Sequence, residues 1–334
     1  MPHSSLTPPP APLRRLLEQS SRILAVAHKD PDGDAIGSIA AFAHMLLAQG
    51  KDVRLFCETI LPDHFAWLPL PAPLVRSFAE LGDWRPDLVA ALDCADEDRT
   101  GREMAAFIRT REAGTPLICI DHHIGNPLFA DANWVNTAYC ATGAMIGELA
   151  RHCGIPLKGS FGEALYLALV SDTGSFTYSN TNAHALGMAA EIVENGLSLA
   201  AFTEQYENIW SISRMHLWGQ LMHEVRLECD GAVAVSVVTS KRLQSYGLTF
   251  SALENFASWL RRLKGVKIVL FAYSSKHGTK ISLRSTGGVN VQAIAARFGG
   301  GGHIAAAGVN MKGEPGPNAE IVLQAVKETL GAAG

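Results

Sequence analysis

The stretch Arg22-Ile-Leu-Ala-Val-Ala-His-Lys-Asp-Pro-Asp-Gly-Asp34 decides how this sequence of 334 residues folds. Its first half is a short apolar run, which predicts a buried strand that ends near His28. Its second half is a turn rich in Asp, Pro and Gly, and a helical pattern follows from Ala35 to about Gln49. A strand, a turn and a helix in this order are typical of the start of an alternating α/β fold.

The first half of the sequence continues the same alternation. Apolar runs at Val53–Cys57, Leu88–Leu92 and Leu117–Ile120 predict parallel strands that are covered on both faces. We therefore predict an α/β fold whose main sheet is doubly wound and mostly parallel. The helical patterns lie between and after these strands, near residues 102–111, 142–153 and 163–170.

The remainder of the chain predicts a second, smaller domain of mixed α/β structure. Expected strands there are 232–238, 266–273 and 280–284, and expected helices are 252–263, 291–298 and 319–330. The Pro- and Ser-rich start has nothing to bury and is expected to be a disordered tail. The predicted organisation is a tail (1–15), a first domain (16–195), a helical linker (196–218) and a second domain (219–330).

Charge is distributed unevenly along the chain. Residues 255–334 contain ten basic and three acidic residues, a net charge of +7, whereas the first 254 residues contain 18 basic and 29 acidic residues, a net charge of −11. This asymmetry favours a metal-binding half followed by a phosphate-binding half, although any single Lys or Arg could simply be solvated.

Cysteine usage and hydropathy indicate the compartment. The six cysteines are scattered without a CxxC pair, which favours reduced thiols in a cytoplasmic protein over a disulfide framework or a zinc site. The start of the chain lacks the apolar region of a signal peptide, and no apolar run approaches the length of a membrane span. We expect no membrane association.

Side chains of the kind that bind metals follow three predicted strands and one predicted helix. The carboxyl ends of parallel strands meet at one edge of a sheet, where ligands of α/β proteins bind. These side chains are His28, Asp32 and Asp34 after the first strand, Asp93 after the third, Asp121, His122 and His123 after the fourth, and Asp172 after the helical run 164–170.

Each of these side chains has a simpler interpretation by itself. The Asp-rich turn could cap a helix, as could Asp172, and Asp93 could be an ordinary carboxylate at the end of a strand. Together they are difficult to explain in this way, because several carboxylates at one edge repel each other unless cations neutralise them. Carboxylates combined with imidazoles suit manganese, magnesium, iron or cobalt.

A glycine run in the basic part of the chain is a candidate site for phosphate. Gly299, Gly300, Gly301 and Gly302 can present successive backbone N–H groups to an anion. A glycine run alone would favour a flexible turn that ends a helix, with Gly299 as its cap. Phosphate binding is favoured here because His303 follows the run and Arg284, which can bind phosphate through two nitrogens, ends the preceding strand.

These motifs resemble those of the DHH phosphoesterase family, in the same order and at similar separations. The four N-terminal motifs are His28–Asp34, Asp93, Asp121-His122-His123 and Asp172-Thr-Gly-Ser-Phe176, and Phe298–Gly308 resembles the signature of the DHH-associated C-terminal domain. The resemblance covers residues 16–330. Within the family, the compact two-domain form is most similar to the bacterial nanoRNase/pAp phosphatase group.

The resemblance implies a two-metal centre with named ligands. One ion would be held by His28, Asp32 and Asp93, with Asp93 bridging to the other. The expected ions are two divalent cations, Mn²⁺ first, with Mg²⁺ or Co²⁺ as alternatives. The second ion would be held by Asp34, Asp93, His122 and Asp172; Asp121 would orient an imidazole, His123 would reach the substrate, and Arg284, Gly300, Gly301, Gly302 and His303 would bind it.

The resemblance also implies hydrolysis of very short oligoribonucleotides (nanoRNA, including pApA) to mononucleotides, and of 3′-phosphoadenosine 5′-phosphate (pAp) to AMP. The second domain would close over the substrate and so measure its length. Four alternatives stay open: a cyclic or linear dinucleotide phosphodiesterase, a RecJ-like single-strand exonuclease, a family II pyrophosphatase and a nucleotide-binding regulator without catalysis. The expected partners are short RNA or nucleotide substrates; no protein partner is evident, and a homodimer is left open.

Overall fold

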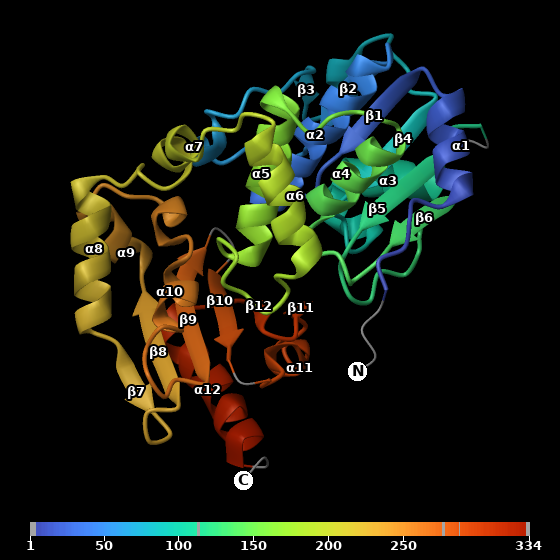
Figure 1. The fold of residues 1–334 in the computed structure, drawn as a ribbon. Coiled ribbons are helices and arrows are strands. Elements are labelled where there is room, and N and C mark those ends of the chain that lie inside the picture. The colour runs from blue at the N-terminus through green and yellow to red at the C-terminus, as the bar shows by residue number, and fades with distance from the viewer. Residues whose placement is uncertain (1–4, 112–113, 276–277, 287, 332–334) are drawn as a thin grey trace. The chain divides into compact units, whose positions relative to one another are not determined.

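The computed structural model describes residues 5–111, 114–275, 278–286 and 288–331. The chain divides into two compact units, Met1–Ile209 and Trp210–Gly334 (Figure 1). Each unit has its own sheet, and each is described here by itself.

The N-terminal unit is built on a six-stranded sheet in the order β3-β2-β1-β4-β5-β6, in which all neighbours are parallel. This confirms the predicted doubly wound parallel sheet, and it places the carboxyl ends of all its strands at one edge. The strands are β1 (Arg22–Val26), β2 (Asp52–Phe56), β3 (Leu74–Val75), β4 (Leu88–Leu92), β5 (Leu117–Asp121) and β6 (Ala132–Val135).

Helices cover both faces of this sheet. Along β1, Ile23 and Ala25 belong to the core that α2, α4 and α5 share, whereas Leu24 and Val26 face the core of α3. Both faces are apolar, which is why the parallel strands read as continuous apolar runs. The helices are α1 (Ala11–Gln19), α2 (Gly33–Ala48), α3 (Arg102–Thr110), α4 (Thr142–His152), α5 (Gly159–Thr173), α6 (Ala183–Glu194) and α7 (Leu199–Tyr206), with short 3₁₀ turns η1 (Asp63–Phe65), η2 (Phe78–Leu81) and η3 (Glu97–Thr100).

The start of the chain differs from the expected disordered tail. The carbonyl oxygen of Thr7 accepts hydrogen bonds from Nε1 of Trp134 (3.2 Å) and from the hydroxyl of Tyr139 (3.0 Å). Leu13 of α1 is completely buried. The described residues from Ser5 onward therefore pack against β6 and the segment after it, because a distant part of the chain supplies the partners that the local sequence lacks.

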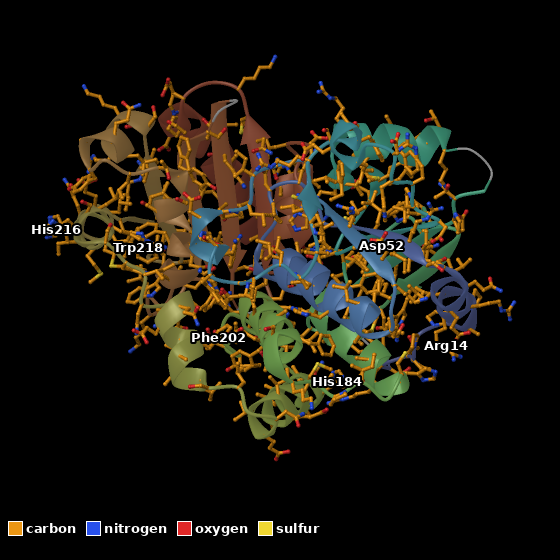
Figure 2. All side chains as sticks on the ribbon, turned by 90° about the horizontal axis from the view of Figure 1, so that it is seen from above. Arg14, Asp52, His184, Phe202, His216 and Trp218 are labelled. Atoms are coloured by element: carbon orange, nitrogen blue, oxygen red, sulfur yellow. The ribbon has the colours of Figure 1, made fainter. Side chains whose placement is uncertain are left out.

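The stretch expected to be a helical linker contains parts of both units. In α7, Phe202, which Figure 2 labels, packs edge-on against Trp67 and Tyr166, with ring centroids 5.4 and 4.8 Å away. These contacts fix α7 to the N-terminal unit. The next helix, α8 (Ile212–His223), buries Trp218 in the core of the C-terminal unit. Among the described residues, no single helix has the length and apolarity to span a membrane; only the pair α6 and α7, bent by 111°, meets that test when combined.

The C-terminal unit has a mixed six-stranded sheet in the order β11-β12-β10-β9-β8-β7. Only β8 and β9 are parallel, and the other neighbours are antiparallel. Helices α11 and α12 cover one face and α8 and α10 the other, which confirms the smaller mixed α/β fold. The remaining elements are β7 (Arg226–Glu228), β8 (Val233–Val238), α9 (Ser240–Ser245), η4 (Phe250–Leu253), α10 (Phe256–Leu260), β9 (Ile268–Ser275), β10 (Gly278–Ser285), α11 (Val291–Ala296), β11 (Gly301–His303), β12 (Ala306–Met311) and α12 (Pro315–Gly331).

One local prediction for this unit was wrong, and the glycine run has structure that the sequence did not indicate. The helix expected over 252–263 is broken into η4 and α10, with Asn255 at φ +64° between them. The glycine run is not a loop throughout, since Gly301 and Gly302 form part of β11 and pair with Gly308 and Ala307. Glycine is needed here for close approach: a Cβ atom on Gly302 would lie 2.5 Å from the carbonyl oxygen of Ala306.

Candidate metal centre

The carboxyl edge of the parallel sheet brings together the metal-type side chains of the N-terminal unit. His28 lies two residues beyond β1, Asp93 directly follows β4 at φ +58°, and Asp121 is the last residue of β5. Asp32 caps α2, because its Oδ1 accepts hydrogen bonds from the N–H groups of Asp34 and Ala35, both at 3.1 Å. Topology thus places residues from three distant stretches at one edge.

The position of Asp172 differs slightly from the expectation. The sequence predicts that this residue opens the loop after an apolar helix. In the structure α5 continues to Thr173, so Asp172 lies in the last turn of the helix. The rigid helix places its Oδ2 3.0 Å from Nε2 of His122.

Three of these side chains form a first group around Asp93. Nε2 of His28 lies 3.6 Å from Oδ2 of Asp93 and 3.8 Å from Oδ1 of Asp32. Their nitrogen and oxygen atoms lie within 4.8 Å of one another, close enough to hold one ion. His28 and Asp93 are buried, whereas the side chain of Asp32 is half exposed.

A second group lies on the other side of Asp93. It consists of Asp34, His122 and Asp172, whose ligand atoms also lie within 4.8 Å of one another. Nε2 of His122 is 3.6 Å from Oδ2 of Asp34 and 3.6 Å from Oδ1 of Asp93. Oδ2 of Asp93 therefore faces the histidine of the first group, and Oδ1 faces the histidine of the second. Nδ1 of His123 also lies 3.6 Å from Oδ1 of Asp93.

The pKa shifts within the cluster indicate that its carboxylates favour positive charge. Burial raises the pKa of Asp34 well above its usual value, and the like charges of Asp93 and Asp172 add to this effect. Burial alone would lower the pKa of His28, but hydrogen bonding and attraction to Asp32 and Asp93 outweigh it and raise the pKa to about 10. The buried carboxylates thus stabilise any cation among them.

The donor set fits divalent cations. Ligand atoms at about 2.1 Å from an octahedral ion, at right angles to each other, lie about 3 Å apart. The N···O distances within the two groups range from 3.0 to 3.8 Å. Carboxylate and imidazole donors without a thiolate suit Mn²⁺, Mg²⁺ or Co²⁺.

His123 has a different environment from His122. Its Nδ1 lies 2.7 Å from Oδ1 of Asp121, and the other carboxylate oxygen, Oδ2, accepts a 2.7 Å hydrogen bond from Nδ2 of Asn126. A carboxylate only accepts when ionised, so Nδ1 of His123 donates and Nε2 remains for other partners. The sequence reasoning missed Asn126, although it lies only five residues beyond Asp121.

The start of α4 holds two of the carboxylates in place. Oδ1 of Asp34 accepts from the N–H of Gly143 at 2.9 Å, and its Oδ2 accepts from the N–H of Thr142 at 2.7 Å. The hydroxyl of Thr142 also donates to Oδ1 of Asp93 at 2.9 Å. Thr142 was likewise missed, because nothing in its local sequence signals contact with residues far from it in the chain.

Two of the C-terminal candidates, Arg284 and His303, lie along one row of the second sheet. Arg284 on β10 pairs with Ala306 on β12, which pairs in turn with His303 on β11. Two strand spacings, about 10 Å, therefore separate the backbones of Arg284 and His303. Nε of Arg284 lies 3.3 Å from the hydroxyl of Ser258. The side chain of His303 lies outside the described part of the structure. Gly301 and Gly302 precede His303 on β11 and pair with Gly308 and Ala307, and Gly300 lies directly before this strand.

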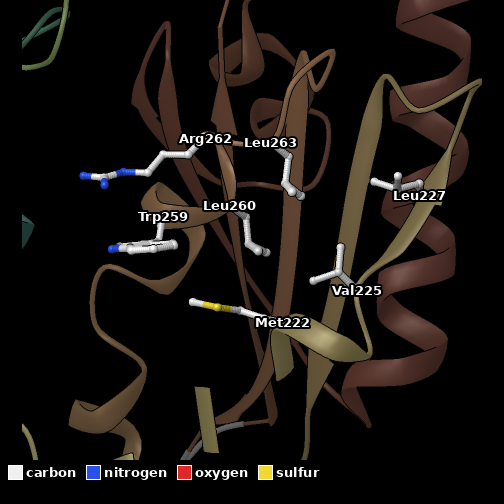
Figure 3. A pocket seen from close by; sticks show the side chains of 7 residues that line it. All are labelled: Met222, Val225, Leu227, Trp259, Leu260, Arg262 and Leu263. Atoms are coloured by element: carbon white, nitrogen blue, oxygen red, sulfur yellow. The ribbon is translucent and has the colours of Figure 1, made fainter. Parts of the chain in front are cut away.

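A separate pocket of about 380 Å³ lies elsewhere in the C-terminal unit (Figure 3). Its walls are mainly apolar, and Arg262 is the one charged residue among those that line it. The pocket lacks the converging polar groups that hydrolysis would need. It is lined by Met222, Val225, Leu227, Trp259, Leu260, Arg262 and Leu263.

Two family models match the chain. The model described as "DHH family, N-terminal domain" matches residues 22–169, and the model described as "DHHA1 domain" matches residues 230–332. Each match lies within one of the two compact units. The family resemblance inferred from the sequence motifs is thereby confirmed.

Known proteins align over nearly the whole chain. The bifunctional oligoribonuclease and PAP phosphatase NrnA of Thermus thermophilus is 31% identical over 93% of this chain and 91% of its own length. An exopolyphosphatase-related protein from Bacteroides fragilis superposes with a TM-score of 0.85 at 26% identity, over 95% of this chain and 94% of its own. RecJ of Thermus thermophilus in complex with Mn²⁺ shares the fold, with a TM-score of 0.55 at 16% identity over 97% of this chain and 56% of its own.

Proposed function

Because this chain belongs to the DHH family of phosphoesterases, we propose that it hydrolyses very short oligoribonucleotides to mononucleotides, and pAp to AMP. The observation that carries the proposal is the pair of ligand groups that meet at Asp93. Two ions that share a carboxylate are suited to phosphate hydrolysis, because they can stabilise the attacking and the leaving oxygen together. The substrate class is that of NrnA of Thermus thermophilus, an oligoribonuclease and PAP phosphatase to which this chain is similar over nearly its full length.

Each of the two ligand groups is proposed to hold one divalent cation. His28, Asp32 and Asp93 would hold one divalent cation, and Asp34, Asp93, His122 and Asp172 would hold the other, with Mn²⁺ as the preferred ion. When bound, the ions would lower the pKa of a water molecule and neutralise charge on the phosphate oxygens. The protein contributes a fixed frame, since Asp34 and Asp93 are tied to the start of α4.

His123 would act on the substrate. Asp121 accepts from Nδ1 of the ring, and Asn126 donates to Asp121, so that Nε2 is the atom that would contact the substrate. A histidine in this state can donate a proton to the leaving oxygen or bind a phosphate oxygen. In the C-terminal unit, Arg284, Gly300, Gly301, Gly302 and His303 would bind the nucleotide.

The test is a substrate panel with Mn²⁺ and Mg²⁺ compared. It contains pAp, pApA, RNAs of two to five nucleotides, a longer RNA, single-stranded DNA and pyrophosphate. We expect Mn²⁺-dependent release of AMP from pAp and of mononucleotides from the short RNAs, with activity falling as length increases. Preference for long single-stranded DNA would instead indicate a RecJ-like exonuclease, and preference for pyrophosphate a pyrophosphatase.

A matched pair of variants separates the metal centre from general damage. Asp93→Asn removes the charge that faces both histidines and should abolish turnover, whereas Asp83→Asn removes an exposed carboxylate and should not. Circular dichroism checks that both variants fold. Near-normal activity of Asp93→Asn in saturating Mn²⁺ would contradict the two-metal assignment.

A further inference from the structure

A guanidinium group beside the metal centre has no role in the mechanism described so far. Arg99 is the third residue of η3 and is half-buried, and its Nη2 lies 3.3 Å from Nδ1 of His28. Its backbone is fixed at this position, because its N–H donates to Oδ1 of Asp96 at 2.9 Å and its carbonyl accepts from the N–H of Lys29 at 2.7 Å. The side chain is therefore built into the surroundings of His28.

The contact between Arg99 and His28 is not a hydrogen bond. Nδ1 of His28 lies 2.9 Å from the carbonyl oxygen of Lys29, and a carbonyl only accepts, so Nδ1 carries a proton and donates it there. A guanidinium group also has only donors. The N–H groups of Arg99 thus lie beside Nδ1 of His28, which is itself a donor, and the two residues form no hydrogen bond.

The acidic side chains next to Arg99 in the sequence form ion pairs with Arg109. Glu97 pairs with Nε of Arg109 at 2.6 Å, and Asp98 also pairs with Arg109. Within the described ranges, no carboxylate lies at ion-pair distance from the guanidinium of Arg99. A half-buried guanidinium without a carboxylate partner has donors suited to the oxygens of a phosphate.

The position of Arg99 identifies which part of the substrate it can bind. Nε2 of His28 faces the carboxylates of Asp32 and Asp93, whereas Nδ1, on the other side of the ring, faces Arg99. The imidazole ring thus separates the guanidinium from the carboxylates that would hold the ion. An anion bound by Arg99 would therefore lie beside the reacting phosphate and not at the reacting position itself.

We propose that Arg99 binds a second, non-reacting phosphate of the substrate, and that it thereby selects nucleotides that carry one. The inference rests on the proposed function. The planar fork of the guanidinium matches two phosphate oxygens, and its charge offsets the repulsion between the substrate and the nearby carboxylates. Arg99 is a specificity residue in this role, because the bond it makes is the same before and during the reaction.

The test compares pApA with ApA, which lacks the 5′-phosphate. Arg99→Gln should raise KM for pApA about tenfold or more while kcat stays nearly unchanged, since a charged hydrogen bond that does not change during the reaction is lost. KM for ApA should not change. Arg99→Lys should lie between the wild type and Arg99→Gln, and Arg85→Gln, which removes an exposed arginine of the same unit, should match the wild type.

Two results would overturn the inference while leaving the proposed function intact: an equal loss on pApA and ApA, or a weaker affinity for Mn²⁺ in Arg99→Gln, which would mean that Arg99 acts through His28. Failure of the wild type to hydrolyse either dinucleotide would overturn the proposed function. In that case calorimetry with the Mn²⁺-loaded protein still decides the role of Arg99. Tighter binding of pApA than of ApA, lost in Arg99→Gln, supports it, and equal binding by the wild type refutes it.

Discussion

The hydroxyl of Thr142 donates a 2.9 Å hydrogen bond to Oδ1 of Asp93, and this bond joins the first turn of α4 to the end of β4. The N–H of the same residue binds Oδ2 of Asp34 at 2.7 Å. Thr142 therefore restrains one carboxylate of each ligand group, and all three residues are buried. Partners that orient metal ligands in this way tune affinity for the metal.

Thr142→Val is expected to weaken Mn²⁺ binding about 10- to 100-fold, because it removes the hydroxyl but keeps the shape and the N–H bond to Asp34. Equilibrium dialysis with Mn²⁺ measures the change, and Thr142→Ser should restore affinity. Thr100→Val is the control, since Thr100 is equally buried but its hydroxyl binds only the carbonyl of Glu97. Equal losses in Thr142→Val and Thr100→Val would show that burial, not the bond to Asp93, decides the effect.

Asn126→Ala is expected to lower kcat about 10- to 100-fold with little change in KM, because the carboxylate of Asp121 loses its 2.7 Å bond and with it the orientation of His123. Steady-state kinetics with pAp and Mn²⁺ measure both parameters. Asn133→Ala breaks bonds to the carbonyls of Leu128 and Ala130 in the same loop without touching Asp121. A similar loss in that variant would assign the effect to the loop.

Gly37→Ala is expected to destabilise the N-terminal unit by about 1–3 kcal/mol. A Cβ atom there would lie 2.5 Å from the carbonyl oxygen of Ala164, where α2 packs against α5. Gly187→Ala, in the exposed part of α6, meets nothing within 4 Å and should be neutral or stabilise by up to about 1 kcal/mol. Urea unfolding of both variants measures the difference, and equal stabilities would contradict the packing of α2 on α5.

Tyr139→Phe is expected to change how stability depends on pH. Burial, together with the nearby charge of Glu148, raises the pKa of Tyr139 to about 12, against an ordinary value of 10.0. A raised pKa means that the stabilisation is complete below pH 10 and is lost as the pH rises through about 12. The wild type should therefore lose stability more steeply across this window than Tyr139→Phe does.

The hydrogen bond of Tyr139 gives a second measurement. Its hydroxyl donates to the carbonyl oxygen of Thr7, so Tyr139→Phe should also loosen the N-terminal segment at neutral pH and cost about 1 kcal/mol. Limited proteolysis near the N-terminus reports this loosening, and urea unfolding at pH 10–12 reports the slope. Identical slopes in the two proteins would show that Tyr139 does not titrate differently on folding.

Most of the strands that the sequence predicts are buried on both faces. Leu88–Leu92 and its neighbours are apolar throughout, so their pattern does not depend on a partner. The short strands β3, β6, β7 and β11 were missed, because two to four residues become a strand only where a neighbour offers its hydrogen bonds. The six-residue strand β12 was also missed, because it begins with Ala306, Ala307 and Gly308, which are residue types that strands rarely use. The packing of Leu13 and Thr7 was missed because their partners lie more than a hundred residues away.

The sequence alone determined the order of the main apolar strands and the helices between them, and the chemical types at the sheet edge, because apolar periodicity and turn residues act locally. It also supplied the motifs that relate the chain to its family. Only the tertiary structure decided that Thr142 binds Asp93, that Asn126 binds Asp121 and that Arg99 stands beside His28 without an anion. Such contacts depend on how distant segments pack, and a hydrogen bond between two distant residues produces no periodic pattern in the sequence from which it could be predicted.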